Sequence, residues 1–116
     1  MINIEMNKNI YLILFLLLNI KVSAQKLFSV NYKSQADFSV YVVDYESQAD
    51  LNVFKVDYDS QAKGNEGNWY FVNYISNADK KVFFEKYSAQ ADLKIYFVKY
   101  KSRSGWKNMS KKHYLY

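Results

Sequence analysis

A six-residue motif, Y-x-S-Q-A-D or a close variant of it, occurs six times in this chain of 116 residues. Its tyrosines follow one another at intervals of 13 residues, with a single interval of 16, and they are Tyr32, Tyr45, Tyr58, Tyr74, Tyr87 and Tyr100. A fixed period indicates one supersecondary unit that is copied along the chain. The long interval contains the sequence KGNEG at 63–67, which is typical of a widened turn.

The residues between the motifs have the composition of short β-strands. Five positions before each motif tyrosine the residue is Leu, Val, Trp or Ile, and four positions before it the residue is Phe or Tyr. These residue types favour strands, and positions two apart lie on the same face of a strand. Both faces are partly apolar. The motif tyrosines extend one of these apolar columns, so we expect them to belong to the core.

The motif itself predicts a turn. Its Ser-x-x-Asp pattern resembles a capping box, in which the serine oxygen accepts a hydrogen bond from a backbone N–H three residues later. We therefore expect each motif to form a tight turn or a single helical turn, with glutamine amides bonding to backbone groups of neighbouring turns. A residue type needed in every turn serves folding rather than catalysis. The predicted structural turn residues are Ser34, Gln35, Asp37, Ser47, Gln48, Asp50, Ser60, Gln61, Ser76, Asn77, Asp79, Gln90 and Asp92.

The short period limits the fold class. Strands of about eight residues joined by about five residues leave no room for helical crossovers, which need roughly a dozen or more. Strands that follow one another must therefore reverse or arc sharply. The sequence predicts an all-β domain of six short strands, or seven with the tail, in a closed or wrapped arrangement. A barrel, a solenoid and a propeller-like ring all fit this pattern.

The N-terminus has the order of a secretory signal peptide. A short stretch with Lys8 precedes an apolar run of 11 residues at 10–20, and the small-residue sequence VSA follows at 22–24. The run is shorter than the ~20 residues that cross a bilayer as a helix. We expect a signal peptide over 1–24, cleavage after Ala24, a secreted or periplasmic location without a transmembrane span, and a single domain over 25–116.

Charge and cysteine content narrow the classes of partner and site. Removing the signal peptide lowers the formal net charge from +5 to +4, and no basic cluster accompanies a nucleic-acid-binding motif, so nucleic acid is not an expected partner. The chain contains no cysteine, so disulfides cannot stabilise it. With one histidine, His113, no metal site, cofactor site or catalytic site is predicted. We expect a monomer.

Two stretches of the sequence resemble a known family. They are YESQADLNVFKVDYDSQAKGNEGNWYFVNY at 45–74 and KSRSGWKNMSKKHYLY at 101–116, and both are similar to the septoil-knot family of small, mostly bacterial proteins. The resemblance covers Lys26 to Tyr116. It implies an all-β domain wrapped into a compact 7(1) torus knot without free sheet edges. It implies no particular biochemical activity.

Aromatic residues make up 19% of the chain, and they provide the best candidates for binding. Tyrosine and tryptophan side chains can stack on sugars or anchor a partner protein. The candidate interaction surface consists of Trp69, Trp106, Lys111, Lys112 and His113. The favoured function is an exported, very stable, non-enzymatic structural or binding module of the cell envelope or extracellular space, with an unidentified partner. The alternatives are a carbohydrate-binding module that uses surface Tyr and Trp, and, with less support, a hydrolase.

Overall fold

The computed structural model describes residues 25–116, and the predicted signal peptide lies outside the described residues. Short strands alternate with single 3₁₀ turns, which confirms the all-β class. The strands are β1 (Lys26–Ser29), β2 (Phe38–Val42), β3 (Leu51–Lys55), β4 (Asn68–Phe71), β5 (Lys80–Phe84), β6 (Leu93–Phe97) and β7 (Gly105–Trp106). The turns are η1 (Lys33–Gln35), η2 (Glu46–Gln48), η3 (Asp59–Gln61), η4 (Ile75–Asn77), η5 (Ser88–Gln90), η6 (Lys101–Arg103) and the longer η7 (Met109–Leu115). Between residues 25 and 116, no helix has the length and hydropathy of a membrane span.

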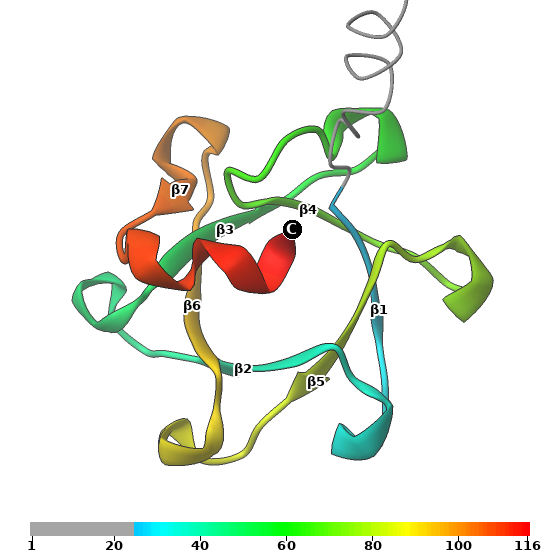
Figure 1. The fold of residues 1–116 in the computed structure, drawn as a ribbon. Helices are drawn as coiled ribbons and strands as arrows, with labels where there is room; N and C mark the ends of the chain where they lie inside the picture. Colours follow the sequence, from blue (N-terminus) through cyan, green and yellow to red (C-terminus); the bar gives the residue numbers. More distant parts are fainter. Residues whose placement is uncertain (1–24) are drawn as a thin grey trace, which may run out of the picture.

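Six of the strands form a closed parallel barrel. The order around the barrel is β4-β1-β5-β2-β6-β3, and β3 pairs with β4 to complete the ring. Strands that follow one another in the sequence therefore do not reverse. β1 and β2 both pair with β5, and β2 and β3 both pair with β6, so each of these steps arcs past one strand. The chain circles the barrel twice, and β4–β6 of the second circuit fill the places left by β1–β3 of the first (Figure 1). The remaining strand, β7, pairs antiparallel with the start of β3.

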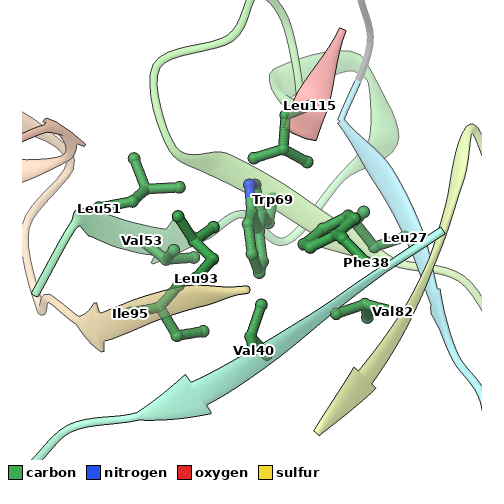
Figure 2. Packing of buried hydrophobic residues seen from close by; sticks show 10 residues of the cluster. All are labelled: Leu27, Phe38, Val40, Leu51, Val53, Trp69, Val82, Leu93, Ile95 and Leu115. Atoms are coloured by element: carbon green, nitrogen blue, oxygen red, sulfur yellow. The ribbon is translucent and has the colours of Figure 1, made fainter. Parts of the chain in front are cut away.

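The barrel interior is a packed apolar core. The residues five positions before each motif tyrosine point inward and have no exposed surface, and they are Leu27, Val40, Val53, Trp69, Val82 and Ile95. A second layer is formed by Phe38, Leu51 and Leu93, which come two positions earlier in their units. Trp69 stands at the centre of the core, edge-on to Phe38 at a centroid distance of 6.2 Å (Figure 2). The barrel is therefore filled by side chains rather than hollow.

The prediction that the motif tyrosines belong to the core is wrong. All six are exposed, with fractional exposures between 67% and 70%. Each tyrosine is the extended N-cap residue of a 3₁₀ turn, where the chain has already left the barrel wall; in η2 the Gln48 N–H donates to the carbonyl oxygen of Tyr45 over 3.0 Å. Because the turns project outward around the barrel (Figure 1), the tyrosine rings face solvent.

The turn prediction is confirmed, but the predicted capping box of serine and aspartate is wrong. The N-cap residue is the tyrosine, and in η1, η2, η4, η5 and η6 no side chain caps the turn. The motif aspartates instead accept a hydrogen bond from a backbone N–H of a neighbouring strand. The pairs are Asp37 with Lys81 N at 2.7 Å, Asp50 with Lys94 N at 2.8 Å, Asp79 with Lys26 N at 3.1 Å and Asp92 with Ser39 N at 2.9 Å. Each of these aspartates therefore joins the end of a turn to the barrel wall.

The expected bonding of glutamine amides to neighbouring turns is also wrong. The Gln61 Oε1 atom accepts a hydrogen bond over 3.3 Å from the Tyr58 N–H, which belongs to the same turn. Gln35, Gln48 and Gln90 are exposed. Among residues 25–116, no motif glutamine side chain bonds to a neighbouring turn. Charged side chains make such contacts instead, from Arg103 of η6 to Glu46 of η2 and from Lys33 of η1 to the Gln90 carbonyl oxygen of η5.

The C-terminal helix η7 closes one opening of the barrel. It lies across the ring of strands (Figure 1), and Leu115 enters the core with 1% of its surface exposed (Figure 2). The Nε2 atom of Gln25, which precedes β1, donates a hydrogen bond to the Leu115 carbonyl oxygen over 3.2 Å. The Nδ2 atom of Asn65 donates to the Lys112 carbonyl oxygen over 3.1 Å. The tail is therefore part of the folded domain.

Leu115→Ala should lower the free energy of unfolding by about 2–3 kcal/mol, because it removes buried methyl groups at a place where the end of the barrel can only partly collapse. Urea denaturation followed by tryptophan fluorescence measures the change. Tyr116→Ala is the matched control, because Tyr116 is 69% exposed and its loss should change stability by less than about 0.5 kcal/mol. Equal effects of the two substitutions would show that η7 does not plug the barrel.

Candidate binding surface

The two tryptophans of the predicted interaction surface are structural. Trp69 is fully buried, so the prediction that it contributes to a surface is wrong. Its position, five residues before Tyr74, is the one that every unit directs into the barrel. Trp106 lies in β7, and its indole N–H donates to the Asn65 carbonyl oxygen over 2.9 Å. Trp106 thereby holds β7 against the widened turn.

The remaining candidates belong to η7, and two of them attach the tail to the barrel. The Lys111 ammonium lies 3.2 Å from Asp50 Oδ2, and the Lys112 ammonium lies 3.2 Å from Glu66 Oε1. His113 is exposed, with Nδ1 3.0 Å from the Ser110 carbonyl oxygen and its ring 4.3 Å from that of Tyr114. The structure does not gather the predicted residues into one surface.

Three of the hollows on the outer wall of the barrel are built to one plan. Each lies on a strand whose residue four positions before the motif tyrosine is itself a tyrosine. The β2 hollow has a volume of about 320 Å³ and is lined by Tyr41, Val43, Gln48, Ser88 and Lys94. The β4 hollow has a volume of about 400 Å³ and is lined by Lys26, Asp59, Tyr70, Val72, Asn73, Tyr74 and Asn77. The β6 hollow has a volume of about 170 Å³ and is lined by Glu46, Tyr96, Phe97, Val98, Lys99, Tyr100 and Arg103.

The repeat and the strand order explain why the hollows are alike. Each has a floor made by a tyrosine of its own strand and the valine directly after that strand, and a residue three positions after the motif tyrosine forms one side. The neighbouring turn on one side of the ring contributes its first residue, which is Ser88 of η5 for the β2 hollow and Asp59 of η3 for the β4 hollow. The strand on the other side contributes a lysine, Lys94 of β6 or Lys26 of β1. One unit of sequence thus builds the same site at several places.

The sequence contains a signal for these hollows that the predicted interaction surface did not include. The residue four positions before the motif tyrosine is Phe in the first, third and fifth units and Tyr in the second, fourth and sixth. All three hollows are on the units with tyrosine. A polar atom on an aromatic ring in the outer wall distinguishes these units from the others.

In two other units, an ion pair lies at the place that corresponds to the β2 and β4 hollows. At the β6 hollow, Arg103 and Glu46 form an ion pair at 2.5 Å, and the hydrogen bond from Arg103 holds the pKa of Glu46 below its ordinary value. Directly after β5, Glu85 forms an ion pair at 2.7 Å with Lys33 of η1, and the Glu85 side chain is only 5% exposed. Glu85 stands where the other five units have valine. The β2 and β4 hollows differ in offering a lysine that has no such partner among residues 25–116.

A family model that describes the 7(1) septoil knot domain matches residues 24–107. The chain belongs to the septoil-knot family. The match agrees with the closed barrel that the chain circles twice, and it confirms the resemblance found in the sequence. The matched region of the septoil-knot domain ends before η7, so the helix that closes one opening of the barrel lies beyond this region. Comparisons with curated proteins and with solved structures found no match. Membership of this family brings no known activity with it.

Because of Asp50, the septoil-knot domain should become less stable as the pH falls into the acidic range. Burial raises the pKa of this carboxyl, but hydrogen bonds from Lys94 N–H, Asn108 and Lys111 outweigh burial and hold the pKa below its ordinary value of 3.8. A depressed folded-state pKa contributes stability above the unfolded pKa, and this contribution is lost as the pH falls from about 3.8 through the folded-state value.

Thermal unfolding of the natural chain and of Asp50→Asn, measured from neutral pH down to about pH 2, tests this prediction. The variant should unfold at a lower temperature at neutral pH, and the difference should shrink as the pH falls below about 4. A difference that stays constant over the whole range would contradict the assigned role of the Asp50 carboxylate.

Proposed function

We propose that this septoil-knot domain is an exported, non-enzymatic module that binds a component of the cell envelope or extracellular space. The binding surface is the ring of motif tyrosines together with the β2 and β4 hollows beside them. The observation that carries the proposal is the 67–70% exposure of all six motif tyrosines. The N-terminal order of a charged, an apolar and a small-residue stretch supports export.

Folding alone gives no reason for tyrosine at these positions. The turn uses the backbone of its N-cap residue, whose carbonyl oxygen accepts the hydrogen bond, and an exposed ring adds little to the core. Large exposed aromatic side chains that recur in one pattern are characteristic of interaction surfaces, where tyrosine offers a wide apolar face and a polar tip. Repetition also favours binding over catalysis, since a catalytic group is needed once.

The test is a triple variant, Tyr45→Ala with Tyr74→Ala and Tyr100→Ala. Because these side chains are exposed, each substitution should change the free energy of unfolding by less than about 0.5 kcal/mol. Co-sedimentation with envelope and extracellular material from the source organism should fall strongly, because three anchors are lost together. The readout is the fraction of protein bound at a fixed amount of material.

The matched control changes serines in the same three turns, Ser47→Ala with Ser76→Ala and Ser102→Ala, and it should bind like the natural chain. The proposal fails if the tyrosine variant binds as well as the control. It also fails if the tyrosine variant unfolds, because the tyrosines would then be structural. Mass spectrometry of the native protein should find Gln25 at the N-terminus, and an intact Met1 chain would argue against export.

A further inference from the structure

We infer that the β2 and β4 hollows bind sugar units of an acidic glycan chain. The inference rests on the proposed binding function and names its ligand class. The two hollows have five features in common: a tyrosine floor, a valine beside it, a side-chain amide, an oxygen-bearing side chain from the neighbouring turn, and a lysine. Each feature matches a part of an acidic sugar ring.

The floors fit the apolar face of a pyranose. Tyr41 in the β2 hollow and Tyr70 in the β4 hollow are half-buried, and both line their hollows. The C–H groups on one face of a sugar ring pack against such an aromatic face. The volumes of about 320 and 400 Å³ lie at the small end of the range for ligand pockets, which suits a short saccharide.

The polar side chains fit sugar hydroxyls. Gln48 in the β2 hollow and Asn77 in the β4 hollow carry an amide that can donate and accept at the same time. Adjacent hydroxyls of a sugar need this combination. Ser88 of the β2 hollow donates and accepts, whereas Asp59 of the β4 hollow only accepts. An apolar ligand would leave these groups without partners.

The lysines point to an acidic sugar. Lys94 and Lys26 line the hollows, and no carboxylate within residues 25–116 forms an ion pair with either ammonium. No acidic side chain lines the β2 hollow, whereas Asp59 offsets part of the charge of Lys26 in the β4 hollow. A sugar carboxylate beside Lys94 would complete a charge-assisted hydrogen bond. The β2 hollow should therefore depend more on the acidic group than the β4 hollow does.

Two like sites on one small domain fit a ligand that repeats. β2 and β4 lie three places apart in the ring of six strands, so the two hollows face opposite sides of the barrel. A polysaccharide offers the same unit many times, and its chains can occupy both hollows at once, so attachment through both is tighter than through either alone. Weak contacts at each hollow are then sufficient for firm attachment to a polysaccharide.

The experiment measures the binding of three probes to the purified chain by isothermal titration calorimetry, with the contacted residues identified by NMR shifts. The probes are an oligogalacturonate, its neutral methyl ester, and a polyglutamate of similar charge. We expect the oligogalacturonate to bind at least about tenfold more tightly than the ester, which corresponds to one charge-assisted contact. Polyglutamate should bind weakly, because it has no ring to stack on tyrosine.

Variants place the binding on the barrel. Lys94→Gln and Tyr41→Leu should each weaken oligogalacturonate binding about tenfold. Tyr96→Leu in the β6 hollow is the matched control, and it should leave the affinity unchanged because the Arg103–Glu46 pair already occupies that place. Lys94→Gln removes a charge from a partly exposed side chain, so it tests the site without disturbing the core.

Several outcomes would overturn the inference. One is an affinity for polyglutamate or the methyl ester equal to that for the oligogalacturonate. Another is binding of Lys94→Gln and Tyr41→Leu with the affinity of the natural chain. If no saccharide binds while the tyrosine triple variant still loses its attachment to envelope material, the ligand class is wrong and the binding function stands. If that triple variant also binds normally, both proposals fall.

Discussion

Gly67→Ala is expected to lower the free energy of unfolding by more than about 4 kcal/mol, and most of the protein should then be unfolded. Losses of this size are typical of severe defects in a protein core. Gly67 comes directly before β4 and has a φ of +86°. A Cβ atom there would lie 2.3 Å from the carbonyl oxygen of Asn52, 3.2 Å from Leu51 Cδ1 and 3.3 Å from the backbone nitrogen of Gly105. Asn52 belongs to β3, whose backbone is fixed by its neighbours in the barrel, so the oxygen cannot move away cheaply.

Gly64→Ala provides the matched comparison within the same widened turn. Gly64 also has a positive φ, +73°, but no atom would lie within 4 Å of an added Cβ. This substitution should lower the free energy of unfolding by only ~1–2 kcal/mol, which is the cost of placing alanine in the left-handed region of backbone conformation. Chemical denaturation of both variants gives the two values. Similar losses at both positions would mean that the close approach of the chain to Asn52 does not limit the fold.

Asp50→Ala is expected to lower the free energy of unfolding by about 4 kcal/mol, because several hydrogen bonds to one charged group are lost together. The Asp50 carboxylate accepts from Lys94 N–H at 2.8 Å, from the Lys111 ammonium at 3.2 Å and from Asn108 Nδ2 at 3.3 Å. Without it, the Lys94 N–H in the barrel wall has no partner, and η7 loses an attachment. The effect is measured by urea denaturation at neutral pH, where the carboxylate is charged.

Two controls separate the contributions. Gln48→Ala, in the same motif, should change stability by less than about 0.5 kcal/mol, because Gln48 is exposed. This result would agree with the absence of the glutamine bonds to neighbouring turns that the sequence predicted. Asp37→Ala removes the equivalent bond to Lys81 N–H without touching η7, and it should cost about 1.5–3 kcal/mol. An Asp50→Ala effect no larger than that of Asp37→Ala would exclude a role for the tail contacts.

The repeat predicted the strands and turns well, because strand composition and turn residues act locally. It could not predict which strands pair. A period of 13 residues looks the same whether a strand lies beside the next one or skips a place, and the decision depends on closing the ring. The knotted topology came from the resemblance to a family rather than from the pattern. The parallel pairing of β1 with β5 joins residues as distant as Leu27 and Lys80.

The candidate site was predicted poorly because both faces of each strand are apolar. Val40 points into the barrel and is fully buried, yet Val43 lies on the outer face and is also only 5% exposed, since neighbouring turns cover it. Hydrophobicity alone therefore could not distinguish the inner from the outer column. The tyrosines that extend the outer column were assigned to the core, and Trp69 of the inner column was assigned to the surface.

The order of strands around the barrel also decides when the chain can fold as it is made. None of β1, β2 and β3 pairs with another of these three, and the earliest partner that any of them has is β4, which begins at Asn68. A growing chain that ends before Asn68 therefore has no hydrogen bond between barrel strands to form. The residues made so far stay extended, so they can pass through a narrow channel without first having to unfold. The second circuit then supplies the missing partners one strand at a time, and Leu115 arrives last to close the end.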